Sequence, residues 1–230
     1  MRYNQFNQPI GESLNTFNLP SNPKVSILKG QYCRLEKLSE QHIDDLYNHF
    51  SLDDDAPNWT YLSEEPIKDK SEFKQYINNQ INSQDPYFMA IIDQNTNVAL
   101  GELSLLRINP NDASIEVGHI HFSNALKQTR IATEAHFLLA SYVFEELGYR
   151  RYEWKCDDFN QASMNSAKRL GFTYEGTFRQ HKIYKERNRN TAWFSMLDSE
   201  WPSIKQQYEQ WLTPSNFDNN GQQYERLNIQ

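Results

Sequence analysis

The feature that most constrains the fold is a strand, a helix and a second strand in the second half of the chain. Residues 113–122, ASIEVGHIHF, and residues 150–156, RRYEWKC, both have the composition of strands. Between them, apolar residues recur at helical spacing from Thr133 to Leu147, and Gly148 follows where a helix C-cap glycine is expected. Such a unit closes as a right-handed parallel crossover, so the sheet contains a parallel pair.

The other segments predict an antiparallel remainder. An extended segment from Val25, VSILKGQYCRLEKL, precedes a helix capped by Ser39 and a second helix over residues 69–81. YFMAIID, VALGELSLLRI and ASIEVGHIHF are separated by short turns and predict a meander. TYEGTFRQHKIY and RNTAWFSML predict a closing pair of strands. We therefore expect an α/β (α+β) fold with a mixed, mostly antiparallel central sheet of about seven strands, flanked by helices.

Composition indicates one domain and excludes several partners. A chain of 230 residues with 38% hydrophobic content buries one core, predicted over 24–212, with an N-terminal extension (1–23) and a polar C-terminal tail (213–230). A net charge of -7 gives no general attraction for nucleic acid or anionic membranes. Cys33 and Cys156 lack metal-ligand spacing, so no metal is expected. No signal peptide or long apolar run occurs, which predicts a cytoplasmic protein.

The stretch KQTRIATEA, residues 127–135, joins the first crossover strand to its helix. A helix N-terminus offers unpaired N–H groups and positive dipole charge to a phosphate. Small side chains at Ala132 and Thr133 permit close approach, and Lys127 and Arg130 add positive charge. The alternative is the start of a core helix with Thr133 as its N-cap, and the stretch alone favours that alternative.

A second helix start strengthens the case for a binding site. Asn160-Gln161-Ala162-Ser163 begins the next helix, which ends at Leu170-Gly171-Phe172. The two helix starts follow strands whose carboxyl ends open beside each other if the strands splay. Open α/β sheets bind ligands at such places.

These segments in this order resemble the GNAT acetyltransferase superfamily, in particular its branch similar to the RimJ/RimL protein N-terminal acetyltransferases. The resemblance covers roughly Val25 to Trp201 and is tightest from Glu116 to Trp201. It implies a sheet splayed between its fourth and fifth strands and acetyl-CoA as co-substrate. It also implies an N-acetyltransferase, a monomer or homodimer, whose acceptor is a small-molecule amine or a protein N-terminus.

The resemblance assigns the cofactor-binding residues. In the family's signature turn, Lys127 takes the Gln/Arg position, Arg130 the first glycine position and Ala132 the second. A turn that needs positive φ is strained at a non-glycine residue, so we expect Arg130 to reshape the turn. The residues expected to bind the cofactor are Ile120, His121, Phe122, Lys127, Gln128, Thr129, Arg130, Ile131, Ala132, Thr133, Asn160 and Ser163.

Acetyl transfer needs a group that takes a proton from the amine. Glu116 is the first candidate, because it lies on the strand beside the predicted thioester; a structural carboxylate is the alternative. By strand alternation His119 and His121 point to the opposite face, so only one of these sets faces the substrate. His119 is assigned to the acceptor site.

The proton donor is assigned to Ser163, which matches the serine that the resemblance implicates in RimL-like enzymes. The tyrosine that many superfamily members carry later in this helix corresponds to Ala167. The glutamate of RimL-like enzymes falls on Gln180-His181-Lys182, which contains none. Ser163 is therefore the catalytic residue retained on the helix.

Trp59 and Tyr61 are expected to line the acceptor pocket, because their irregular loop DDDAPNWTYLSEEP is acidic and suits a cationic amine. The alternative is that these aromatic residues belong to the core. Two rival functions stay open: a CoA-binding protein of the same fold without catalysis, and a structural α/β interaction domain.

Overall fold

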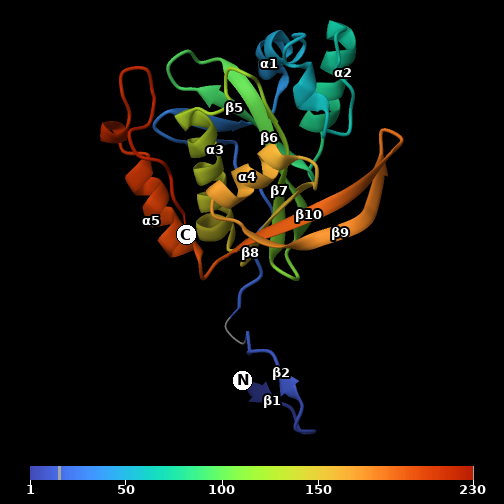
Figure 1. Cartoon of the computed structure of the whole chain (residues 1–230), viewed down its shortest axis with the longest axis vertical. Coiled ribbons are helices and arrows are strands. Elements are labelled where there is room, and N and C mark those ends of the chain that lie inside the picture. Colours follow the sequence, from blue (N-terminus) through green and yellow to red (C-terminus); the bar gives the residue numbers. More distant parts are fainter. Residues whose placement is uncertain (15–16, 230) are drawn as a thin grey trace.

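The computed structural model describes residues 1–14 and 17–229 and contains a mixed sheet with helices on both faces (Figure 1). In spatial order the strands are β3 (Ile27–Lys29), β4 (Cys33–Lys37), β5 (Tyr87–Asp93), β6 (Ala99–Asn109), β7 (Ser114–Phe122), β8 (Arg151–Asp157), β10 (Arg187–Leu197) and β9 (Thr173–Tyr184). Among the strands of the described residues, only β7 and β8 pair in parallel. The mixed, mostly antiparallel sheet is thus confirmed. It has eight strands because the segment from Val25 folds as the hairpin β3–β4.

The helices begin and end largely where local signals place them. They are η1 (Glu40–His42), α1 (Ile43–Phe50), η2 (Ala56–Trp59), α2 (Lys70–Ile81), α3 (Arg130–Ser141), the π-helical turn η3 (Tyr142–Leu147), α4 (Gln161–Arg169), α5 (Trp201–Trp211) and η4 (Pro214–Asn216). Asp69 caps α2 by accepting the backbone N–H groups of Ser71 and Glu72. Gly148 ends η3 in the left-handed conformation, with φ 81°.

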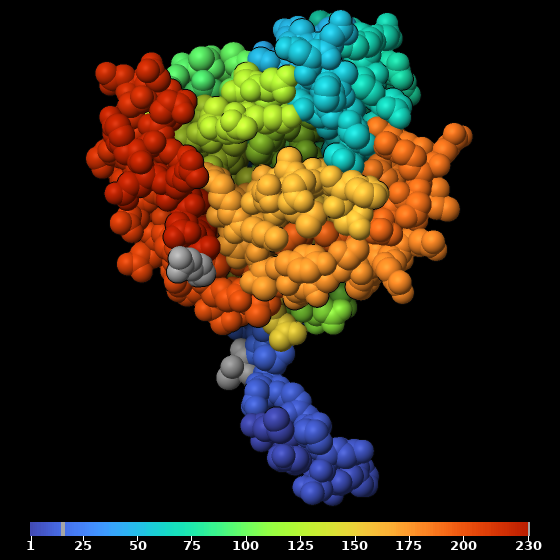
Figure 2. Space-filling view, in the orientation of Figure 1, coloured from blue at the N-terminus to red at the C-terminus, as the bar shows by residue number. Residues whose placement is uncertain are grey.

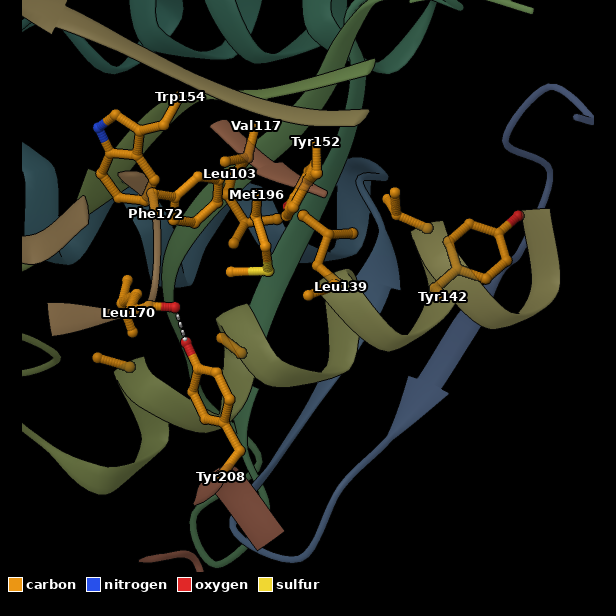
Figure 3. Close-up of a cluster of buried hydrophobic side chains, with 14 of the residues drawn as sticks. Leu103, Val117, Leu139, Tyr142, Tyr152, Trp154, Leu170, Phe172, Met196 and Tyr208 are labelled. Carbon is orange, nitrogen blue, oxygen red and sulfur yellow. Dashed lines mark hydrogen bonds between the residues drawn. The ribbon is translucent and has the colours of Figure 1, made fainter. Parts of the chain in front are cut away.

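Two cores lie on opposite faces of the sheet. The larger contains apolar side chains of the sheet, α3, α4 and α5. Figure 3 shows Val117 and Tyr152 of the sheet against Leu139 of α3, and the Tyr208 hydroxyl donating to the Leu170 carbonyl at 3.0 Å. The smaller core packs α1, α2 and η2 against β5. The larger core therefore includes side chains of both β7 and β8, whereas the smaller core includes none of β8.

The chain ends differ in how they meet this body. Strands β1 (Arg2–Tyr3) and β2 (Pro9–Ile10) form a small hairpin that projects away from the domain (Figures 1 and 2). The segment after α5 folds back, and Phe217 and Leu227 are buried in the larger core. Among the residues that the structure describes, no helix combines the length and apolar character that crossing a bilayer requires.

Candidate active site

An opening between β7 and β8 organises the site. The two strands pair over four residues each, Ser114–Val117 with Arg151–Trp154, and separate after Val117 and Trp154. Within the described chain, the later residues of β7, Gly118–Phe122, therefore have no strand partner on the β8 side. Backbone N–H and C=O groups on such an edge are available to an extended ligand. The predicted splay is confirmed. It lies between β7 and β8, which are the fifth and sixth strands of the sheet because the segment from Val25 forms two strands instead of one.

The turn before α3 lies beyond the end of β7. Thr129 is the N-cap of α3, and its Oγ1 accepts the backbone N–H of Ala132 at 3.2 Å. Arg130 is already the first helical residue, and the positive φ, 61°, falls on Gln128. Arg130 therefore carries no left-handed strain, and Thr133 as N-cap is wrong. A turn that differs in shape from those of relatives stays a prediction. The first-turn N–H groups of Arg130 and Ile131 have no intrahelical acceptor.

The side chains around this turn point in different directions. The Arg130 guanidinium stacks on the Tyr32 ring, 4.2 Å from its centroid, and lies 5.3 Å from that of Phe217. The Lys127 ammonium contacts the side-chain oxygen of Asn58 in the η2 segment. Thr133 is buried and accepts from an Arg169 nitrogen at 3.0 Å. Of these three predicted cofactor residues, Thr133 thus has its side chain committed to packing.

Glu134 fixes the start of α3 to the sheet. Its buried carboxylate accepts the backbone N–H groups of Gln31, Tyr32 and Cys33, each at 2.7 Å. A Cβ at Gly30 would lie 2.6 Å from this carboxylate. The acidic residue of KQTRIATEA therefore anchors the first turn of α3 to the β3–β4 turn, a role that sequence reasoning missed.

A β-bulge in β7 changes which side chains share a face. His121 pairs with Glu102 of β6, and Gly118 pairs with Ser104, so β7 has one more residue than β6 between these pairs. His119 carries the bulge, with φ 47°. The extra residue cancels the alternation, and both histidines lie on the same face of the sheet as Glu116. The prediction that they oppose Glu116 is therefore wrong.

His121 and Trp59 belong to the smaller core. The His121 ring stacks on Phe50 with 3.5 Å between centroids, and its Nε2 lies 3.4 Å from an Asp55 oxygen. Trp59 has an exposed fraction of 0% and donates its indole N–H to the Phe50 carbonyl. Trp59 therefore has no surface with which to contact an acceptor. Tyr61 does line the cavity described below, with its hydroxyl bonded to the Phe159 carbonyl.

Glu116 is buried and ion-paired with two cations. Its Oε2 contacts the Arg107 guanidinium and lies 2.8 Å from Lys155 Nζ. Lys155 also pairs with Glu153 at 2.7 Å and lies over the Trp193 ring. If this carboxylate took a proton, Arg107 would lose its ion pair and Lys155 would lose one of its two. The geometry therefore fits the structural alternative for Glu116 and not a general base.

His119 has the geometry that Glu116 lacks. Its half-buried ring packs on Phe88, with centroids 5.2 Å apart, and lines the cavity. Burial, and then the nearby Arg107 and Lys182 cations, lower the pKa of the His119 imidazole. Within the described chain, no hydrogen bond to either ring nitrogen of His119 is present. A neutral imidazole with free nitrogens can accept a proton.

The first turn of α4 borders the same opening. The Asn160 side-chain oxygen accepts the Ser163 backbone N–H at 3.1 Å, which makes Asn160 the N-cap. The Ser163 hydroxyl oxygen accepts from the Trp154 indole N–H at 2.9 Å. Ser163 also hydrogen-bonds the Cys156 thiol, an interaction that lowers the pKa of that thiol against the larger effect of burial. Ala167 is buried and offers no proton donor.

One cavity of about 210 Å³ connects these groups. It runs from Asn160 and Ser163 past Ile120 and His119 to the β9–β10 hairpin. Its charged lining residues are Arg107, Glu116, Lys155, Asp157, Lys182 and Arg189. Ile120 packs on the larger core, and Phe122 lies 5.6 Å from His136, ring to ring.

Comparison with known proteins decides the family. Residues 33–173 match the model of the acetyltransferase (GNAT) domain. The crystal structure of a GCN5-related N-acetyltransferase from Brucella melitensis is 44% identical, with a TM-score of 0.91, covering 93% of this chain and 97% of that one. This chain belongs to the GNAT acetyltransferase family.

Two further structures have the GNAT fold of this chain. A probable GNAT-family acetyltransferase from Chromobacterium violaceum is 36% identical, with a TM-score of 0.79 and coverage of 85% and 98%. An acetyltransferase from Salmonella typhimurium, described as modifying the N-terminal serine of ribosomal protein L7/L12, is 20% identical, with a TM-score of 0.65 and coverage of 74% and 98%. At that identity the likeness concerns the fold alone. No curated protein sequence matches the chain.

GNAT domains typically use acetyl-CoA, and the residues at the opening fit that molecule. An unpaired strand edge at Gly118–Phe122 suits its amide-bearing arm, and the first turn of α3 offers N–H groups to its phosphates. In the described residues, no three His, Cys, Asp or Glu side chains gather in a way that could hold a metal ion.

The cations of the cavity are candidate functional residues that sequence reasoning missed. Arg107 comes from β6, Lys155 from β8, and Lys182 and Arg189 from the β9–β10 hairpin. Their convergence depends on long-range strand pairing. The one local signal was the concentration of Lys and Arg on both sides of the turn between TYEGTFRQHKIY and RNTAWFSML.

Proposed function

We propose that this GNAT protein is an acetyl-CoA-dependent N-acetyltransferase that transfers acetyl to a primary amine by direct attack on the thioester. The observation that carries this proposal is the opening between β7 and β8. Beside it lies the cavity that His119 lines, and the unpaired part of β7 leads along the chain to the first turn of α3. The printed description of the Brucella relative as an N-acetyltransferase supports the same reaction class. The RimJ/RimL-like branch stays a prediction.

The cofactor-binding roles divide between backbone and side chains. Backbone groups of Ile120, His121 and Phe122 would pair with the extended arm, and the N–H groups of Arg130 and Ile131 would bind the pyrophosphate. Asn160 and Ser163 would border the reacting end. Bound acetyl-CoA supplies the acetyl group as an activated thioester. Binding along this edge would direct that group into the cavity.

His119 is the proposed general base, in place of Glu116. Its lowered pKa keeps the imidazole neutral near pH 7, ready to take a proton from the attacking amine. Glu116 would hold Arg107 and Lys155 in place beside it. The bulge at His119 is what brings the base to this face.

Ser163 is the proposed proton donor to the leaving thiolate. Its oxygen accepts the Trp154 N–H, and its hydroxyl lines the cavity, so its proton would turn from the Cys156 thiol towards the leaving sulfur. Two buried free cysteines fit the reducing cytoplasm that we propose as its location.

A turnover assay tests the proposed function. Purified protein is incubated with acetyl-CoA and a panel of amines, and the released CoA thiol and the acetylated amine are both measured. We expect amine-dependent thiol release matched by product mass. Acetyl-CoA binding by calorimetry without turnover on any amine would support instead a CoA-binding protein without catalysis. Absence of binding would leave only the structural domain.

The His119→Gln variant tests the assigned base. Loss of a general base costs about 10²- to 10⁴-fold in kcat. In the unmodified enzyme kcat/KM should fall as pH drops through the lowered pKa of His119, because only the neutral ring accepts a proton. His49→Gln, the same change on α1 outside the cavity, is the control and should keep both rate and profile. Unchanged kinetics in His119→Gln would remove His119 from catalysis.

A further inference from the structure

The cavity carries more positive than negative charge at its hairpin end. Of its charged lining residues, four are cations and two are carboxylates. Both carboxylates are already engaged. Glu116 holds Arg107 and Lys155, and Asp157 accepts the Tyr184 hydroxyl at 2.8 Å. Among the described lining residues, the cations therefore outnumber the carboxylates, and Glu116 is the carboxylate that forms ion pairs.

Lys182 and Arg189 are the cations of the described lining that form no ion pair. They are directly opposed across the β9–β10 pair, where like charges repel and destabilise a sheet. In the part of the chain that the structure describes, no carboxylate oxygen lies within 4.0 Å of a side-chain nitrogen of Lys182 or Arg189. Arg189 donates its Nε–H to Thr191 at 3.1 Å, which orients the guanidinium.

Neighbouring groups respond to this charge. Burial, and then Arg107 and Arg189, lower the pKa of Lys182. Burial, and then Lys182, Arg189, Arg107 and Lys155, lower the pKa of His181. The four cations thus act together on one region. Such a cluster attracts an anion and repels a second positive charge on a ligand.

We propose that the acceptor is a small amine that also carries an anionic group, a carboxylate or a phosphate, which Lys182 and Arg189 bind. The inference rests on the proposed acetyl transfer and names its substrate class. The guanidinium of Arg189 offers paired donors that match planar oxyanions, and Lys182 adds a point charge. The same cavity is lined by His119, so a small acceptor spans anion site and base.

The positive cavity also favours the chemistry. A nearby cation lowers the pKa of an amine, because it disfavours the ammonium form. The acceptor would therefore reach His119 more readily in its neutral, nucleophilic state. Diamines and polyamines would bring an additional positive charge towards the cluster and be poor substrates. The proposal adds an anionic group to the cationic amine that the acidic loop DDDAPNWTYLSEEP predicts.

Matched substrates test this inference. Several amino acids of different size are compared with their own carboxamides, aminoalkyl phosphates with the corresponding amino alcohols, and both with diamines. We expect kcat/KM at least about tenfold higher for the anionic member of the better pair. The comparison of carboxylates with phosphates identifies which anion fits. Acetylation of carboxamides, amino alcohols or diamines at equal or higher rate would overturn the inference while leaving acetyl transfer intact.

Variants locate the anion site. Lys182→Gln and Arg189→Gln should each reduce the preference for the anionic amine about tenfold or more, with KM for acetyl-CoA unchanged. Lys168→Gln, which removes an exposed cation of α4 outside the cavity, is the control and should keep the preference. A raised KM for acetyl-CoA with an unchanged amine preference would mean that these cations bind the cofactor, and would overturn the inference. A protein inactive on every amine would instead contradict the proposed function.

Discussion

At the scale of the residue, Gln128 carries the left-handed conformation that shapes the turn before α3. A residue with a Cβ is strained there, whereas glycine is not. Arg130 is helical and stacks on Tyr32, so it contributes to stability through its side chain. The family pattern places glycine at the position of Arg130. In this chain the strained position lies two residues earlier.

A pair of glycine substitutions tests this reading of the turn. Gln128→Gly should raise the free energy of unfolding by about 1 kcal/mol, because it relieves a left-handed residue. Arg130→Gly should lower it by about 1–2 kcal/mol, through loss of helix propensity and of the stacked cation. Denaturant unfolding measures both. The opposite signs would show that the positive φ belongs to Arg130.

Glu102 is a second residue whose environment makes a testable demand. It is buried in β6 beside Gln80, whose side-chain nitrogen lies 3.0 Å away, and burial raises the pKa of Glu102 to about 8. Between an unfolded-state pKa of 4.5 and about 8, the native carboxyl keeps a proton that the unfolded chain releases. The contribution of Glu102 to the free energy of unfolding is therefore fully present below pH 4.5 and is lost as pH rises through this window.

The Glu102→Gln variant isolates that contribution. The difference in unfolding free energy between the two proteins should change by about 1 kcal/mol per pH unit across the window, because glutamine does not titrate. Taking the difference cancels the other titrating groups. Denaturant midpoints at a series of pH values measure it. A difference independent of pH would mean that native Glu102 is ionised.

At the scale of the element, the bulge in β7 depends on a close approach of β6. A Cβ at Gly101 would lie 2.8 Å from the His121 carbonyl oxygen and 2.7 Å from a Leu126 methyl group. Only glycine lets the two strands meet at this separation. The position of His119 in the cavity therefore depends on a residue of the neighbouring strand.

Gly101→Ala should displace β7 at the bulge. Overpacking predicts a loss of about 1–3 kcal/mol in unfolding free energy, together with a lower kcat because His119 moves. Gly11→Ala, where an added Cβ meets nothing within 4 Å, is the matched control and should leave both unchanged. An unfolding midpoint and kcat of Gly101→Ala equal to those of the unmodified protein would argue against a rigid bulge.

Local patterns predicted the elements better than the positions of side chains. The crossover helices, their glycine C-cap and the parallel pair follow from periodicity and chain connectivity, and the structure has them. Alternation failed in β7, because one bulged residue inverts every later side chain. Trp59 was assigned to a pocket although it fills the smaller core. Burial of that kind depends on contacts distant in sequence.

At the scale of the whole molecule, the two halves of the site meet at the opening between β7 and β8. The first turns of α3 and α4 follow the ends of these two strands, and the cations of β6, β8 and the β9–β10 hairpin line the cavity. No short motif contains both halves, since they meet only through the eight-stranded sheet. We propose that acetyl-CoA binds along this opening and presents its acetyl group to the cavity.

Amide hydrogen exchange with and without acetyl-CoA tests that claim most directly. We predict that saturating acetyl-CoA slows exchange by roughly tenfold or more in Gly118–Phe122 and in the turn from Gln128 to Thr133. The projecting hairpin of β1 and β2 serves as the internal reference and should exchange at the same rate in both states. If acetyl-CoA binds but leaves exchange in Gly118–Phe122 unchanged, it does not bind along the opening between β7 and β8.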